Sequence, residues 1–203
     1  TGHHHGEDER SERLGLEIVA HMRSRMDEES RRRGLNFTLL ATPAEGLSGR
    51  FVKIDKQWML LTAGTPDRGF NTMTASWGGL GVLFGKPVAF CFVSPLRYTW
   101  QLLDKGDTYT LSFYTEAYRD ALQICGTTSG SDTDKVRATG LTPVTTPSGA
   151  KAFGEAWMVV ECRKLMQQSL SPGAIVDSAE RANWNTKPLN TMFIGEIINV
   201  WIK

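Results

Sequence analysis

Short strand-sized segments separated by turn residues are the feature that most constrains what this chain can fold into. From Phe51 onward, β-compatible runs such as 58–62, 87–93 and 192–202 alternate with stretches rich in Gly, Pro and Asn. Helical patterns are short and do not alternate regularly with the strands, which disfavours a parallel sheet. The sequence therefore predicts an α+β domain that is mainly antiparallel β, closed as a barrel with short peripheral helices.

The residue patterns also bound the individual elements. Strands are predicted at 58–62, 70–77, 87–93, 108–114, 141–145, 155–165 and 192–202. Helices are predicted at 97–105, 116–125 and 132–140, ended by Gly106, Gly126 and Gly140. The glycines between 78 and 85 are interpreted as a barrel corner, and 171–190 as a long loop of the kind that is often functional.

The first 34 residues differ in composition from the rest and are expected to lie outside the folded domain, which is placed at 35–203. They open with His3, His4 and His5 and continue through dense Glu, Arg and Ser. The histidines could be read as a metal site, but a tag-like or flexible segment is the favoured interpretation.

Charge and cysteine content exclude several classes of protein. The formal net charge of the 203 residues is +1, which gives no reason to expect nucleic acid or a membrane surface as a partner. Apolar runs are too short to span a bilayer, and a cytoplasmic location is expected. Cys91, Cys125 and Cys162 lie too far apart for a CxxC pair or a zinc knuckle. They are expected to be buried and inert, with a reactive Cys125 near a cofactor as the alternative.

Common catalytic signatures are missing from the sequence. There is no GxGxxG and no GxxxxGK[ST] motif. Beyond the N-terminal cluster the only histidine is His21, so neither a histidine base nor a histidine ligand set is expected. We therefore predict no catalytic side chain and no metal site.

Polar side chains gather instead at the ends of predicted elements. The densest segment, 71–77, can supply donors and acceptors to a flat heteroaromatic ligand, with Trp77 against the ring edge. An ordinary Thr-rich edge strand is the alternative. The cofactor-binding candidates of this segment are Asn71, Met73, Thr74, Ala75, Ser76 and Trp77.

Two further segments have the character of anion sites. Arg97 and Thr99 stand at a predicted helix N-terminus, where free amides and the helix dipole favour an anion. A helix cap with a solvated arginine is the alternative. The run 127–135 places Ser129 in a loop that can form an amide nest, with Lys135 as a point charge, although a capped loop accounts for it equally.

Taken in order, these segments resemble the flavin reductase-like family, including its flavoredoxin branch. The resemblance spans about 58–200 and rests on Trp58-Met59-Leu60-Leu61-Thr62-Ala63-Gly64, 71–83, Arg97-Tyr98-Thr99, Cys125-Gly126 followed by Ser129-Gly130-x-Asp132-x-Asp134-Lys135, 161–165 and 194–197. It implies an FMN-binding split β-barrel that forms a homodimer, with each flavin near the subunit interface.

The resemblance also implies residue roles. Asn71, Thr74, Ser76 and Trp77 would line the isoalloxazine and ribityl chain, and Arg97, Thr99, Ser129 and Lys135 would serve the phosphate. Ser131 stands where the family often has Arg, which removes one charge from the phosphate or the pyridine-nucleotide contact. The long loop also departs from the family pattern, and Trp184 is its candidate ring cover.

The expected function is hydride transfer from NADH or NADPH to the flavin, with electrons passed to an unknown acceptor. Two alternatives remain. One is a flavoredoxin-type electron carrier without a nicotinamide site, and the other is a flavin-binding module without turnover.

Overall fold

A computed structural model describes residues 54, 57–65 and 67–203 of the chain. The predictions for 1–34, including the His3–His5 cluster and His21, fall outside these described residues. The predicted start of the strand pattern at Phe51 falls outside them as well.

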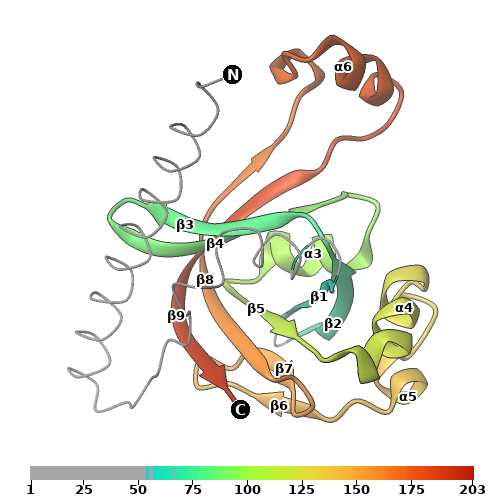
Figure 1. Cartoon of the computed structure of the whole chain (residues 1–203), viewed down its shortest axis with the longest axis vertical. Coiled ribbons are helices and arrows are strands. Elements are labelled where there is room, and N and C mark those ends of the chain that lie inside the picture. Colours follow the sequence, from blue (N-terminus) through green and yellow to red (C-terminus); the bar gives the residue numbers. More distant parts are fainter. Residues whose placement is uncertain (1–53, 55–56, 66) are drawn as a thin grey trace, which may run out of the picture.

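A seven-stranded antiparallel sheet with the order β2-β1-β5-β8-β9-β4-β3 forms the body of the structure. In Figure 1 it curls on itself, with α4 and α5 on one flank. Its strands are β1 Met59–Thr65, β2 Gly69–Ala75, β3 Gly78–Leu83, β4 Lys86–Val93, β5 Thr108–Phe113, β8 Met158–Ser169 and β9 Thr191–Ile202. A separate hairpin joins β6 Pro143–Thr145 to β7 Lys151–Phe153. The antiparallel fold class predicted from the sequence is confirmed.

Short helices connect the strands. They are α3 Tyr98–Lys105, η1 Glu116–Tyr118, α4 Arg119–Thr127, α5 Lys135–Thr139, η2 Pro172–Ala174 and α6 Ser178–Trp184. Asp134 caps α5 by accepting from the Arg137 amide, and Gly140 ends it in the left-handed region at φ 70°.

Apolar side chains on both faces of the sheet hold the fold together. Tyr109, Leu111 and Phe113 of β5 face the barrel interior as predicted, in a cluster that also contains Phe193. A second cluster on the outer face joins Leu60 to α4 and the β6–β7 hairpin. Each fully buried side chain of this kind contributes roughly 1.5–3 kcal/mol.

Three local predictions are wrong. The glycine-rich run 78–85 forms the edge strand β3 and the turn after it rather than a corner. Glycine is required at its start because Gly78 has a φ of 154° and a Cβ there would overlap the Phe90 carbonyl. Gly126 does not end a helix, because α4 continues to Thr127. The loop 171–190 contains α6, whose start is capped by Asp177.

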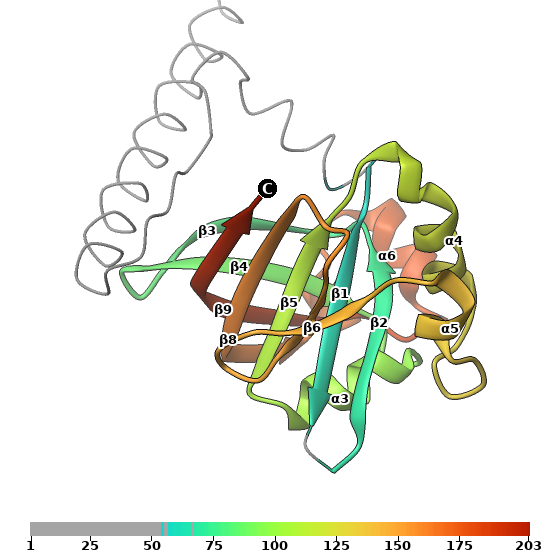
Figure 2. The same cartoon turned by 90° about the horizontal axis from the view of Figure 1, so that it is seen from below.

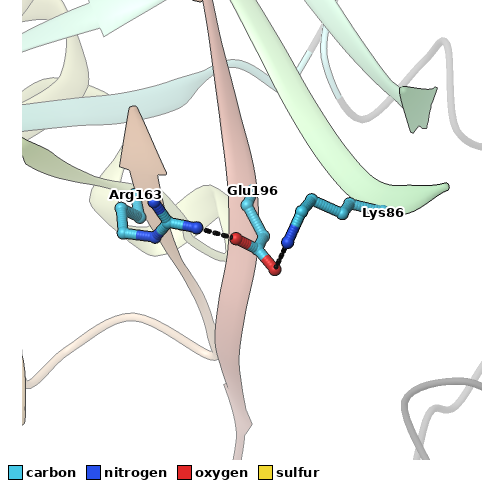
Figure 3. Close-up of polar contacts among 3 residues, drawn as sticks. All are labelled: Lys86, Arg163 and Glu196. Atoms are coloured by element: carbon cyan, nitrogen blue, oxygen red, sulfur yellow. Dashed lines mark hydrogen bonds and ion pairs between the residues drawn. The ribbon is translucent and has the colours of Figure 1, made fainter. Parts of the chain in front are cut away.

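One carboxylate connects three neighbouring strands on the barrel surface, as Figure 3 shows. Glu196 of β9 accepts from Lys86 of β4 at 3.1 Å and from Arg163 of β8. Burial alone would raise the pKa of Glu196, but hydrogen bonds from both cations outweigh it and lower the pKa below its ordinary value. Both cations are about half exposed, so each pair is worth at most about 1 kcal/mol.

A buried carboxylate fixes the β6–β7 turn against the sheet. Glu161 of β8 is fully buried and accepts hydrogen bonds from the hydroxyls of Thr146 and Ser148 and from the Asn199 amide. The buried carboxyl group is therefore satisfied by hydrogen bonds from neutral donors, as buried polar groups generally are.

Candidate functional site

The predicted binding segments meet beside β2, which is an edge strand of the sheet. Figure 2 shows α4 and α5 next to β2, and the N-terminus of α3 also contacts this strand. Because β2 has a strand partner on one side only, backbone groups along its other edge remain available to a ligand or to side chains.

Asn71 joins two of the segments. Its amide nitrogen donates to the Thr99 hydroxyl at 2.9 Å, and both residues are buried. The third segment approaches the same side chain, because a Cβ at Gly130 would overlap the Asn71 carboxamide. The structure therefore brings Asn71, Thr99 and Gly130 together. Sequence reasoning had named the first two and missed Gly130, although a glycine inside a polar loop was its signal.

Side chains of β2 alternate between two environments. Met73 and Ala75 pack in the interior cluster, so only their backbone groups are available to a ligand. Thr74 faces the other way and donates from its hydroxyl to the Leu122 carbonyl of α4. Ser76 is half-buried in the link that follows β2.

Arg97 and Lys135 converge on the C-terminal end of α4. The Arg97 guanidinium donates to the carbonyls of Gly126 and Cys125 at 3.0 and 3.3 Å. The Lys135 ammonium donates to the carbonyls of Cys125 and Thr72 at 2.9 and 2.8 Å. Cations at this end of a helix are stabilised by its unpaired carbonyls and dipole. Two of the three Lys135 protons and two of the five Arg97 protons are thereby used, so each cation keeps donors for an anion.

Lys135 is the most perturbed cation of the site. It is 5% exposed, and burial lowers its pKa from 10.5 to about 8. The nearby Cys125 opposes this shift and the charge of Arg97 adds to it. Burial also lowers the pKa of Arg97 from its ordinary value. An approaching anion would favour the charged form of Lys135, because opposite charge raises the pKa of an amine.

A cavity of about 380 Å³ with both polar and apolar lining residues opens between β2 and α5. Asn71, Gly130 and Lys135 line it together with Thr72 and Asp134. Its volume is within the range of small-molecule sites.

Ser129 stands apart from this cavity. It is exposed, and its hydroxyl pairs with that of Ser131 at 2.7 Å. Ser131 in turn donates to Asp132 at 3.2 Å. The loop is therefore held by short local hydrogen bonds among its own hydroxyls.

Trp77 forms an aromatic contact with a residue far away in the sequence. It is 51% exposed, and its ring lies 6.0 Å from that of Trp184 at an interplanar angle of 70°. Edge-to-face pairs of this kind contribute about 0.5–1.5 kcal/mol beyond burial. Trp184 therefore contacts Trp77, the residue predicted to lie against the edge of the ligand ring.

The three cysteines are buried and free, as predicted. Burial raises the pKa of the Cys91 thiol to about 12 and raises that of Cys162 well above its ordinary value. Burial also raises the pKa of Cys125, while the charge of Lys135 opposes the shift. None of these environments favours a thiolate at neutral pH.

Among the residues that the structure describes, no group of three or more His, Cys, Asp or Glu side chains could hold a metal ion. No helix among them has the length and apolar character needed to cross a bilayer.

Solved structures similar to this one include FMN-binding proteins and flavoredoxins. Flavoredoxin of Desulfovibrio vulgaris (Miyazaki F) matches with a TM-score of 0.58 and 22% identity, over 83% of this chain and 77% of that chain. The FMN-binding protein of Thermus thermophilus with bound p-hydroxybenzaldehyde matches with a TM-score of 0.58 and 19% identity, over 72% and 71%. A protein described as a flavin reductase with a split barrel domain, from Shewanella frigidimarina, matches with 0.59 and 18%, over 81% and 76%. At these identities the likeness establishes the split β-barrel fold.

Comparisons of sequence give a different result. The model of the family described as anaerobic ribonucleoside-triphosphate reductase matches residues 1–116. No curated protein matches the chain. The matched region ends at Glu116, just after β5, and β5 pairs with β8, which lies beyond it. The match therefore ends inside the sheet and does not coincide with a folded unit.

Proposed function

By the family model that it matches over residues 1–116, the chain belongs to the anaerobic ribonucleoside-triphosphate reductase family, and we propose that its split barrel binds FMN and serves as an oxidoreductase. The cavity that two of the predicted segments line together carries this proposal. Asn71 from β2 and Lys135 from α5 line that cavity, and Thr99 from α3 bonds to Asn71. The fold supports the same cofactor, since several proteins that share it are FMN-binding.

The phosphate end of the cofactor is assigned to the cationic side of the cavity. Lys135 and Arg97 would present their remaining protons to the phosphate, and Thr99 would hold Asn71 in position beside it. The unpaired edge of β2 and the half-exposed Trp77 would meet the ring system.

The chemistry would come from the cofactor and its positioning from the protein. When bound, FMN would supply two-electron redox chemistry between NADH or NADPH and an acceptor yet to be identified. No side chain of the cavity needs to act as a general base in such a transfer. The buried Lys135 and the hydrogen-bonded Asn71 act by binding and orientation.

Ribonucleotide reduction is not assigned to the barrel. β1 to β5 lie within the family match, but β8 and β9, which complete the same sheet, lie outside it. The match also includes residues 1–53, which the structure does not describe. We therefore propose no site for ribonucleotide reduction among the described residues.

A homodimer is part of the proposal. Leu80, Val82 and Phe84 are exposed on β3 and its turn, and β3 is an edge strand of the sheet. An apolar edge strand of this kind is usually covered in the functional protein. A second copy of the chain would cover it, and light scattering of the purified protein measures this directly.

The first experiment is an absorption spectrum of the purified protein, before and after anaerobic addition of NADH and of NADPH. Bound-flavin bands that bleach with either nucleotide support the reductase. Bands that persist with both support the electron carrier or the flavin-binding module, which reduction by dithionite then separates. A colourless protein that also fails to bind added FMN contradicts the proposal.

Variants test the assignment of the phosphate end. Arg97→Ala and Lys135→Ala are expected to purify with less FMN while keeping the far-ultraviolet circular dichroism of the wild type. Lys105→Ala, which removes an exposed lysine from the last turn of α3, is the matched control and keeps full occupancy. Full occupancy in all three variants would refute the assignment.

A further inference from the structure

An arm of the chain projects from the barrel between β8 and β9. In Figure 1 it stands clear of the sheet and carries α6 at its far end. The Leu170 amide donates to the Asn190 carbonyl at 3.1 Å and closes its base. The other hydrogen bonds described within 170–190 are internal, for example those from Arg181 to the carbonyls of Ile175 and Val176. The arm is therefore a unit with its own internal order.

The Trp184 ring of the arm contacts Trp77 at the candidate site. Trp184, the last residue of α6, contacts Trp77 edge to face. Lys187 lies over the Trp184 ring, with its ammonium 5.7 Å from the ring centroid. A cation at this distance is attracted by the indole ring. Trp184 is thus held between the barrel on one side and its own arm on the other.

Trp77 needs such a contact to keep one orientation. It lies in the two-residue link between β2 and β3, and half of its surface is exposed. The next residue, Gly78, has a φ of 154° and lies so close to the Phe90 carbonyl that a Cβ would overlap it. The backbone of the link is therefore fixed, but an exposed indole on it can still exchange between rotamers. The Trp184 ring restricts that exchange.

We propose that Trp184 is a positioning residue that fixes the Trp77 ring. It thereby couples the α6 arm to the place beside Trp77 where the flavin ring is proposed to bind. It acts through Trp77 and not through its own contact with the ligand. Movement of the arm then changes the affinity of the site for a flavin ring. This inference rests on the proposed FMN site, but the ring pair itself can be tested without flavin.

The test is a double-mutant cycle on the full chain, with Trp77→Ala, Trp184→Ala and the double variant. In the flavin-free protein, far-ultraviolet circular dichroism should lose the same tryptophan exciton signal in either single variant. For added FMN, Trp184→Ala should raise the dissociation constant about two- to tenfold, which corresponds to the energy of an edge-to-face pair. In the Trp77→Ala background the same substitution should have no further effect.

Two controls separate positioning from general damage to the arm. Val176→Ala removes an 89% exposed side chain from the same arm and should leave both readouts unchanged. Trp184→Phe keeps an aromatic edge and should recover most of the FMN affinity. Equal FMN affinity in the wild type and Trp184→Ala overturns the inference, as does an undiminished effect of Trp184→Ala in the Trp77→Ala background. If the wild type binds no FMN, the proposed function fails instead, while the dichroism still reports on the ring pair.

Discussion

The lowered pKa of Lys135 leads to a specific pH dependence of FMN binding. In the free protein this pKa is about 8 against an ordinary value of 10.5, and burial is its main cause. A phosphate next to the ammonium would raise the pKa again. FMN binding is therefore accompanied by proton uptake at any pH where Lys135 of the FMN-free protein is neutral. The affinity is therefore complete below pH 8 and is lost as the pH rises above it.

The magnitude follows from the two pKa values. At about pH 9.5, a lysine of pKa 8 is only about 3% protonated, whereas one whose pKa has returned towards 10.5 is mostly protonated. The dissociation constant of FMN should therefore rise about 30-fold between about pH 7 and about pH 9.5, which equals about 2 kcal/mol.

Quenching of flavin fluorescence, titrated at several pH values, measures this dependence. Riboflavin is the matched control, because it carries the same ring without the phosphate and should show a much smaller change. Lys135→Met should bind FMN weakly and with little pH dependence in the same range. Equal pH dependence for FMN and riboflavin in the wild type would refute the placement of the phosphate beside Lys135.

Two glycine substitutions test the packing of the barrel and of the site. Gly195→Ala should lower the free energy of unfolding by about 1–3 kcal/mol in urea denaturation, because its Cβ would lie 2.7 Å from the buried Tyr109 hydroxyl. Gly130→Ala should displace Asn71 and reduce FMN affinity at least about tenfold, with a smaller effect on stability. Gly81→Ala is the control for both, since nothing lies within 4 Å of its Cβ; if it matches either variant in effect, the steric argument is wrong.

Strand periodicity predicted most of the sheet because it reflects burial directly. β5 is the clearest case, since Tyr109, Leu111 and Phe113 alternate in sequence and all face the interior. The sequence did not predict β3, because the cause lies in tertiary packing and not in the local sequence. Its Gly78 and Gly79 are needed for close approach to Phe90, which is a neighbour only once β4 has paired.

The sequence predicted which residues belong to the candidate site, but not which of them contact each other. Arg97 and Lys135 were predicted to face an anion, and the structure shows both of them on the carbonyls that end α4. Helix carbonyls and phosphate oxygens attract a cation for the same electrostatic reason, so the sequence alone does not distinguish them. The carbonyl end of α4 was also misplaced because Gly126 was expected to stop the helix, whereas it lies against Thr74.

The order of strands in the sheet has a consequence for how the chain folds during synthesis. β9 pairs with both β8 and β4, and the β4 pairing joins Val88 to Glu196. Until the ribosome has released β9, β4 is paired only with β3 and β8 only with β5, so each of them exposes one apolar strand edge. Contacts so far apart in the sequence form slowly, because a large loop must close before they contribute. Nascent chains of this protein are therefore expected to depend on chaperones until β9 emerges, and substitutions in β9 should lower soluble yield more than equally destabilising ones in β1 or β2.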